Sequence, residues 1–127
     1  MQANKITSND IEIRFEDQQK INSFSKLYQK TREVAAELKK LDEIKQKMED
    51  CHEELELSTD ESVAYNFADS YISVETEKAV ELVEREIAEV KALIEEKVGQ
   101  RNDMKKTMDK LKSELYSKFG NSINLDE

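Results

Sequence analysis

Positions that are mostly apolar recur in alternating steps of three and four along two long stretches of the chain. In residues 16–57 these positions are Phe24, Leu27, Thr31, Val34, Leu38 and Leu41. In residues 76–119 two interleaved series occur, Val80, Ile87, Ile94, Arg101, Met108 and Leu115, and Val83, Val90, Lys97, Met104 and Leu111. This spacing predicts two long helices, each with one narrow seam of the kind that forms a coiled coil.

After Leu41 the first seam has two possible continuations. One keeps the regular spacing through Lys45, Met48, His52 and Leu55. The other runs through Ile44, Met48, Cys51 and Leu55 and needs a three-residue skip, which locally overwinds a coiled coil. We favour the second path because it buries Ile44 rather than Lys45. In the second helix, Lys97 and Arg101 interrupt the seam, and we expect their stems to cover it while their charged heads reach water.

Residues 63–74 break the helical pattern and are the only interior segment that reads as β-structure. Apolar residues alternate with small or polar ones at Val63, Tyr65 and Phe67, and the apolar pattern resumes at Tyr71, Ile72 and Val74. Ala68-Asp69-Ser70 reads as the turn, so the segment predicts a β-hairpin. Because a lone two-stranded hairpin is marginally stable in water, we expect this one to pair with another chain.

These elements predict a mainly α fold in one domain over 1–127. The arrangement is a long antiparallel two-helix coiled coil with one central β-hairpin, preceded by an arm over 1–15 and followed by a tail over 120–127. Thr76 is placed to begin the second helix, and Gly120-Asn121 is placed to end it and free the tail. In the arm, the alternation of Ile11, Ile13 and Phe15 fits either an extended segment or an apolar lead into the first helix.

Composition narrows the function classes. Charged residues make up 39% of the 127 residues and the net charge is −9, which fits solvated helices and argues against nucleic-acid binding. No apolar run of membrane-spanning length occurs, and the first ten residues lack an apolar signal core, so we expect no membrane association. The single cysteine, Cys51, indicates a reducing compartment, namely the cytoplasm with the nucleus as an alternative.

No motif for catalysis stands out. The chain has no glycine-rich phosphate loop, and His52 is its only histidine. Cys51 and His52 are neighbours, but adjacent side chains on a helix point about 100° apart. We therefore expect no catalytic, cofactor-binding or metal-binding residues, and the chain is not predicted to be an enzyme.

Three stretches resemble the prefoldin family, specifically its β-type subunits. They are residues 15–25, residues 115–126 and the central Tyr65 with Tyr71-Ile72, and the resemblance extends from about Ile11 to Glu127. The chain departs from the family pattern at Ala68, where the turn usually has Gly, and at Arg14, where relatives often have Thr. The resemblance implies a subunit of a heterohexamer of α-type and β-type subunits, whose hairpins assemble into a β-barrel platform.

The same resemblance implies a co-chaperone that holds non-native actin and tubulin and passes them to the cytosolic chaperonin without hydrolysing nucleotide. A structural coiled-coil subunit of a cytoskeletal or other multiprotein assembly is the alternative, which the heptads fit equally well but the hairpin and terminal motifs do not. We assign subunit assembly to the hairpin residues Val63, Tyr65, Phe67, Tyr71, Ile72 and Val74. We assign client binding to the terminal residues Ile11, Ile13, Phe15, Ile21, Phe119, Ile123 and Leu125.

Overall fold

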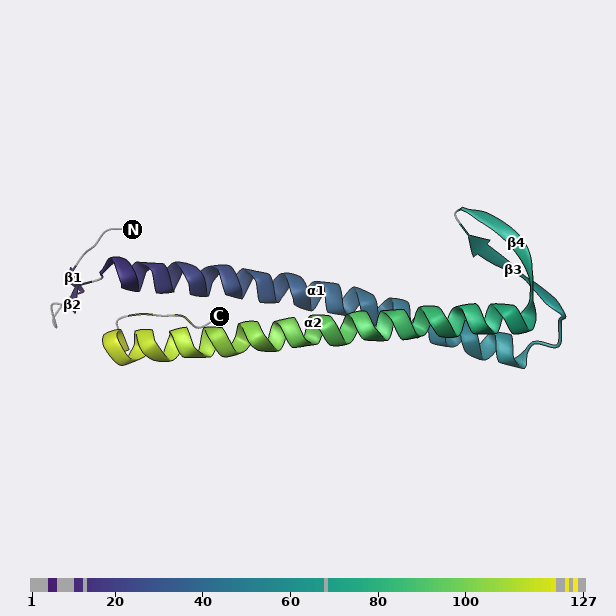
Figure 1. Cartoon of the computed structure of the whole chain (residues 1–127). Helices are drawn as coiled ribbons and strands as arrows, with labels where there is room; N and C mark the ends of the chain where they lie inside the picture. The colour runs from purple at the N-terminus through teal and green to yellow at the C-terminus, as the bar shows by residue number, and fades with distance from the viewer. Residues whose placement is uncertain are drawn as a thin grey trace. The chain divides into compact units, whose positions relative to one another are not determined.

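A computed structural model of the chain describes residues 5–6, 11–12, 14–67, 69–120, 123 and 125. The elements follow the order β1 (Lys5–Ile6), β2 (Ile11–Glu12), α1 (Phe15–Leu57), β3 (Ser62–Phe67), β4 (Ser70–Glu75) and α2 (Thr76–Phe119) (Figure 1). The predicted combination of two long helices with a hairpin between them is confirmed. The first helix begins one residue earlier than expected, and the second has the expected bounds.

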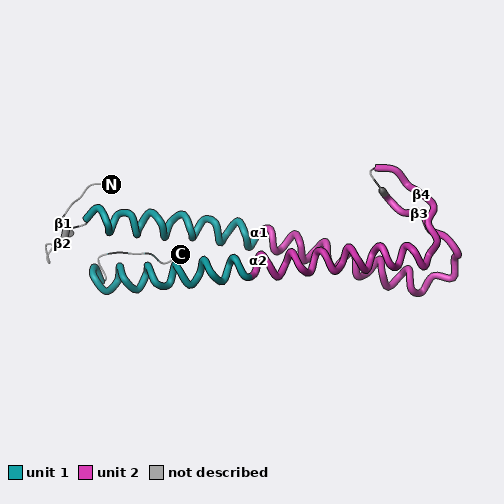
Figure 2. The backbone as a smooth tube through the Cα atoms, viewed as in Figure 1, with its two compact units in different colours: residues 1–35, 99–127 teal, residues 36–98 magenta. Residues whose placement is uncertain are grey.

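The chain forms two compact units (Figure 2). Unit 1 comprises residues 1–35 and 99–127, and so contains the beginning of α1 and the end of α2. Unit 2 comprises residues 36–98, which include the remainder of both helices and the β3–β4 hairpin. The expectation of a single domain across the chain stays a prediction.

In unit 1 the two helix segments pack antiparallel along the predicted seams. Lys20 near the beginning of α1 pairs with Glu114 near the end of α2, at 2.8 Å between Nζ and Oε2. The buried apolar residues of this unit are Phe24, Val34, Met108, Leu115 and Phe119. Phe24 and Val34 are seam positions of the first helix, and Met108 and Leu115 are seam positions of the second.

Unit 2 shows the same antiparallel pairing, with one correction to the predicted seam. Ile44 is 43% exposed and Cys51 is also exposed, whereas Lys45 and His52 are half-buried. The helix therefore keeps the regular heptad path, and the predicted skip through Ile44 and Cys51 is wrong. The lysine stem covers the seam while its Nζ lies 3.6 Å from the carboxylate of Asp42, so burying Lys45 requires no burial of its charge.

Of the two charged residues in the second seam, Lys97 behaves in the same way, whereas the half-buried Arg101 has its Nε buried without a hydrogen-bond partner among the described residues. Lys97 is half-buried, and its Nζ lies 2.8 Å from the carboxylate of Glu37 on the facing helix. The hydrogen bond to Glu37, followed by the charge of that carboxylate, raises the pKa of Lys97. As predicted, the stem of Lys97 lies over the seam. Its ammonium group pairs with the carboxylate of Glu37.

The β3–β4 hairpin turns over two residues rather than three. Phe67 pairs directly with Ser70, so Ser70 belongs to β4, and the predicted three-residue turn is corrected to residues 68–69. Ala68 lies outside the described residues. Asp69 has φ 64°, a left-handed conformation that Asp adopts more readily than most residues with a side chain.

Backbone and hydroxyl contacts fix the chain where the hairpin joins α2. The Thr76 N–H donates to the carbonyl of Glu61 at 2.9 Å, and its hydroxyl donates to the carbonyl of Asp60 at 2.6 Å. These bonds hold the start of α2 against the segment that precedes β3. A second, shorter antiparallel pairing joins β1 to β2, so the arm is extended at Ile11–Glu12.

The two glycines differ in backbone conformation, so the same substitution should have opposite effects at the two positions. A Cβ at either position would meet nothing within 4 Å, but only Gly120 has a positive φ, of 55°. We expect Gly99→Ala to raise the free energy of unfolding by about 1 kcal/mol, because Gly weakens a helix interior by that amount relative to Ala. Gly120→Ala should lower it, because an L side chain is strained there. Urea unfolding followed by circular dichroism tests both, and equal effects of the two substitutions would contradict the roles assigned to these glycines.

Candidate functional site

The described residues offer surfaces rather than a reaction centre. No group of three or more His, Cys, Asp or Glu side chains that could hold a metal ion occurs among them. His52 Nε2 lies 2.9 Å from a carboxylate oxygen of Glu56 without hydrogen-bond geometry, and Cys51 is exposed. Within the described part of the chain, no helix is long and apolar enough to cross a membrane.

The hairpin presents two different faces. Residues directly opposite in an antiparallel pair share a face, and alternate residues of a strand do so too. The register pairs Val63 with Val74 and Tyr65 with Ile72, which places these four predicted assembly residues on one face. Tyr71 pairs with Asn66 and therefore lies on the other face. The predicted assembly residues thus do not form one patch, and the side chain of Phe67 lies outside the described residues.

Exposure differs strongly between the hairpin residues. Tyr71 is 74% exposed and Ile72 is 48% exposed, whereas Val63, Tyr65 and Val74 are half-buried. Residues with such large apolar exposure commonly mark an interaction surface when they lie close together. On β4 these two exposed residues are neighbours, one on each face of the hairpin.

Tyr65 anchors the hairpin to α2. Its hydroxyl donates a hydrogen bond to the carboxylate of Glu86, 21 residues further along the chain. This hydrogen bond, with burial and the charge of Glu86 as further causes, raises the pKa of Tyr65 to about 12. No sequence pattern marks this contact, because Glu86 reads as one of many exposed acids on a helix.

A groove of about 470 Å³ lies between the hairpin and the two helices of unit 2. Its apolar lining comes from Ile44, Met48, Cys51 and Leu55 on α1, Ala64, Tyr65 and Tyr71 on the hairpin, and Ala79 and Val83 on α2. Ile44 and Cys51, which the seam does not use, therefore line this groove. The two competing seam paths along α1 thus serve different surfaces, one facing α2 and the other the groove.

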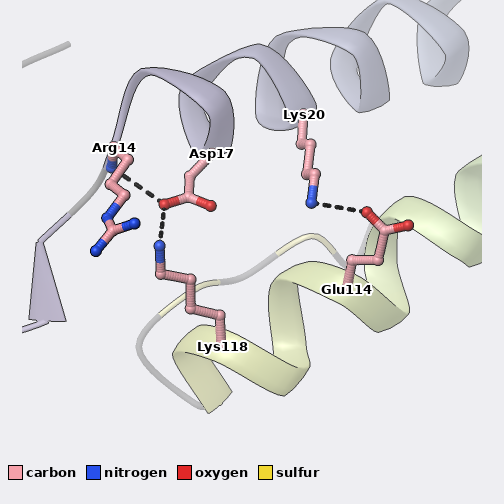
Figure 3. Close-up of polar contacts among 5 residues, drawn as sticks. All are labelled: Arg14, Asp17, Lys20, Glu114 and Lys118. Atoms are coloured by element: carbon pink, nitrogen blue, oxygen red, sulfur yellow. Dashed lines mark hydrogen bonds and ion pairs between the residues drawn. The ribbon is translucent and has the colours of Figure 1, made fainter.

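Two ion pairs join the helices at the end of unit 1 (Figure 3). Lys118 donates to Asp17, and Lys20 pairs with Glu114. Asp17 is 6% exposed, and its carboxylate also accepts a hydrogen bond from the backbone N–H of Arg14 at 3.1 Å. This hydrogen bond, from an acid in the first turn to the N–H of the capping residue, is one of the two that form a capping box. Burial alone would raise the pKa of Asp17, but the hydrogen bonds from Lys118 and Arg14 and the nearby positive charges lower it overall.

The apolar end cluster of unit 1 consists of Leu115 and Phe119, with Ile21, Ile123 and Leu125 packed against them. Phe119 is only 3% exposed, so it is a core residue. The predicted free tail is wrong, since Ile123 and Leu125 are half-buried and the Leu125 N–H donates to the hydroxyl of Tyr116 at 3.1 Å. Gly120 has a positive φ, and the contacts of Ile123 and Leu125 place both residues beside the end of α2.

The remaining predicted client-binding residues differ in their surroundings. Phe15 is 76% exposed at the beginning of α1. Ile21 is half-buried in the apolar end cluster. Ile13 and the side chain of Ile11 lie outside the described residues.

The comparisons with known proteins agree with this architecture. Residues 18–122 match the family model described as prefoldin subunit. The chain belongs to the prefoldin subunit family. It is therefore a subunit of a prefoldin co-chaperone and forms a complex with other prefoldin subunits. The resemblance stated from the terminal and hairpin motifs is confirmed.

Relatives match over almost their whole length. Prefoldin subunit 4 of Saccharomyces cerevisiae is 37% identical over 119 residues, which cover 93% of this chain and 92% of the relative. Prefoldin subunit 4 of Bos taurus is 30% identical over 124 residues, covering 96% and 92%. Probable prefoldin subunit 4 of Drosophila melanogaster is 34% identical over 128 residues, covering 98% and 92%. No solved structure gives a significant match to the chain.

The buried carboxylate of Asp17 predicts an acid-sensitive end of unit 1. Because its pKa is lowered from 3.8 on folding, its stabilising contribution is present above pH 3.8 and is lost as the pH falls through the lower folded value. Asp17→Asn should cost about 1 kcal/mol near neutral pH, a modest value because the partner lysine is partly solvated. That cost should shrink below about pH 4 in urea unfolding followed by circular dichroism, with Glu16→Gln in the same turn as the control. A cost that does not change with pH would contradict the prediction.

The bond between Tyr65 and Glu86 predicts a late-titrating phenol. A raised pKa favours the neutral phenol in the folded state, so its contribution is present below pH 10 and is lost as the pH rises through about 12. The difference in absorbance at about 295 nm between the intact chain and Tyr65→Phe should therefore appear near pH 12. We expect Tyr65→Phe to lower the free energy of unfolding by about 1 kcal/mol. Tyr71→Phe is the matched control, and a Tyr65 signal that appears near pH 10 would contradict the assignment.

Proposed function

We propose that this subunit joins a heterohexameric prefoldin through its β3–β4 hairpin and helps to hold non-native actin and tubulin. The complex delivers these clients to the cytosolic chaperonin without hydrolysing nucleotide. The proposed compartment is the cytoplasm, with additional nuclear work as an alternative. The family membership supports the chaperone class, and the hairpin supports the route of assembly.

The observation that carries the proposal is the unpartnered hairpin. Among the described residues, β3 and β4 pair only with each other, so the outer edge of each strand has backbone groups without a strand partner. Such edges favour the addition of a strand from another chain. Ile72 and Tyr71 supply the exposed apolar area that a partner strand or neighbouring subunit would cover.

Client holding is proposed for the end of unit 1. Phe15 is exposed there, and the apolar end cluster lies in the same unit. Burying one large apolar side chain contributes about 1.5–3 kcal/mol at most, so a single subunit grips weakly. Several subunits that hold one client together gain affinity through their high effective concentration.

Reconstitution of the hexamer from its subunits tests both halves of the proposal. We expect Tyr71→Lys with Ile72→Lys to abolish incorporation into the hexamer, measured by native mass spectrometry, because two charges would be placed in a dry interface. Leu93→Lys, at an apolar residue of α2 that is 40% exposed, is the control and should assemble normally. Circular dichroism should show unchanged helix content in both variants.

The assembled control hexamer should suppress light scattering from denatured actin on dilution, and the mixture with the hairpin variant should suppress less. Normal assembly by the hairpin variant would overturn the proposed interface. An assembled hexamer that does not suppress aggregation would overturn the proposed client.

A further inference from the structure

The part of α1 that lies beside the hairpin carries two apolar stripes. The first faces α2 and follows the regular heptad path through Leu41, Lys45, Met48, His52 and Leu55. The second takes steps of four, three and four residues and lines the groove beside the hairpin with Ile44, Met48, Cys51 and Leu55. A helix that packs against one partner needs only one stripe. The second stripe therefore indicates that α1 has a contact besides α2.

The hairpin covers this second stripe only in part. It turns back alongside the helices of unit 2 and forms one wall of the groove (Figure 1). On the α1 wall, Ile44 is 43% exposed and Cys51 is also exposed. On the hairpin wall, Tyr71 is 74% exposed. The apolar lining of the groove is thus open to solvent between its two walls.

The size and lining of the groove suit side chains from another molecule. Protein interiors contain few voids larger than a water molecule. The groove measures about 470 Å³, which lies within the range of about 300–1,000 Å³ that is typical of binding sites. Its acidic group, Glu86, already accepts a hydrogen bond from the hydroxyl of Tyr65. Apolar side chains therefore complete this groove better than water does.

Charge and family membership select the molecule that supplies them. The chain has a net charge of −9, and residues 53–62, which include the end of the stripe, hold five acids and no base. Two copies that met at this groove would bring these acidic segments together and repel each other. The chain forms a complex with other prefoldin subunits, and the groove is continuous with hairpin residues proposed for that complex. A different prefoldin subunit is thus favoured over a second copy.

We propose that the interface with the neighbouring prefoldin subunit extends from the hairpin onto α1, and that the groove receives large apolar side chains of that neighbour. A strand that pairs with a free edge of the hairpin lies beside the groove, and alternate side chains of such a strand point to one side. Ile44, Cys51 and Tyr71 then belong to one continuous interface. This inference rests on the proposed assembly through the hairpin and identifies the helix face that takes part in it.

The groove gives the hairpin edge a means of choosing its neighbour. Backbone pairing at a strand edge accepts many sequences, whereas pockets for alternate side chains select among them. A shift of one residue in the pairing would turn the neighbour's apolar side chains away from the groove. Met48 lies in the lining, and its flexible side chain can adapt to the shape of the group that enters.

The single cysteine reports on this groove in the unaltered chain. If the neighbour covers it for at least about nine-tenths of the time, N-ethylmaleimide should alkylate Cys51 about tenfold or more slowly in the reconstituted hexamer than in the free chain, as measured by mass spectrometry. The matched control is a chain with Cys51→Ser and Glu53→Cys. Residue 53 is exposed and points about 200° around α1 from residue 51, so the introduced thiol should react equally in both states.

A second experiment places a charge in the groove and leaves the hairpin unchanged. In competition with isotope-labelled intact chain at equal concentration, Ile44→Lys should enter the hexamer about tenfold less or worse by native mass spectrometry, because burying an unpaired charge is costly. Gln46→Lys adds the same charge at an exposed position about 200° around the helix from Ile44, and should enter like the intact chain. Unchanged circular dichroism establishes that both variants are folded.

Equal alkylation of Cys51 in the free chain and in the hexamer would confine the interface to the hairpin, as would normal entry of Ile44→Lys or equal protection of the thiol at position 53. Protection of Cys51 in the free chain that is lost on dilution would assign the groove to a second copy instead. Failure of the proposed assembly route is a separate result, because Tyr71→Lys with Ile72→Lys would then assemble normally. A hairpin variant that cannot assemble, together with a reactive Cys51 in the intact hexamer, removes only the groove contact.

Discussion

Each long helix of this chain carries apolar residues sufficient for one narrow stripe, and burying that stripe is the constraint on which the structure depends. With 39% charged residues, the rest of each helix is stable only in water. The stripes must therefore face each other, and in both units they do so antiparallel. Lysines that lie in the stripe cover apolar surface with their stems while their heads lie near carboxylates, as Lys97 does with Glu37 and Lys45 with Asp42.

The hairpin lies beside apolar residues of α1 that are not part of the seam. Ile44 and Cys51 lie off the stripe that faces α2, and they line the groove beside the hairpin instead. Tyr65 then fixes β3 to α2 through Glu86. The hairpin is therefore held to α2 through Tyr65, while Ile72 and Tyr71, which lie on opposite faces of β4, remain exposed. This contact with the helices supports a two-stranded sheet that is marginally stable alone, and among the described residues the outer edges of β3 and β4 have no strand partner.

Local periodicity predicts the elements but not the contacts between distant positions. The bounds of both helices and the hairpin follow from repeats of three, four and two residues and from turn residues, all of which are local signals. The pairing of Asp17 with Lys118 joins residues 101 positions apart, and although Asp17 suits a helix N-terminus, no local pattern marks its pairing with Lys118. The predicted skip through Ile44 rests on the assumption that the apolar residues of α1 face the seam. That assumption fails because Ile44 lines the groove beside the hairpin instead. The packing of Ile123 and Leu125 against α2 escapes prediction because Gly120 marks the end of a helix, and no local pattern shows what the residues beyond it contact.

Under the proposed client-holding function, the end of unit 1 has to meet two opposing requirements. A surface that binds unfolded segments must be apolar, but an apolar surface left open also attracts other copies of the same protein. Seam residues alone cannot solve this, because where the helices end nothing in the seam covers the last apolar side chains. Ile123 and Leu125 pack against Leu115 and Phe119 and cover part of this apolar end, although both remain half-buried themselves. The ion pairs of Lys118 with Asp17 and of Lys20 with Glu114 join the two helices beside this cluster, so apolar packing and paired charges share the end of unit 1.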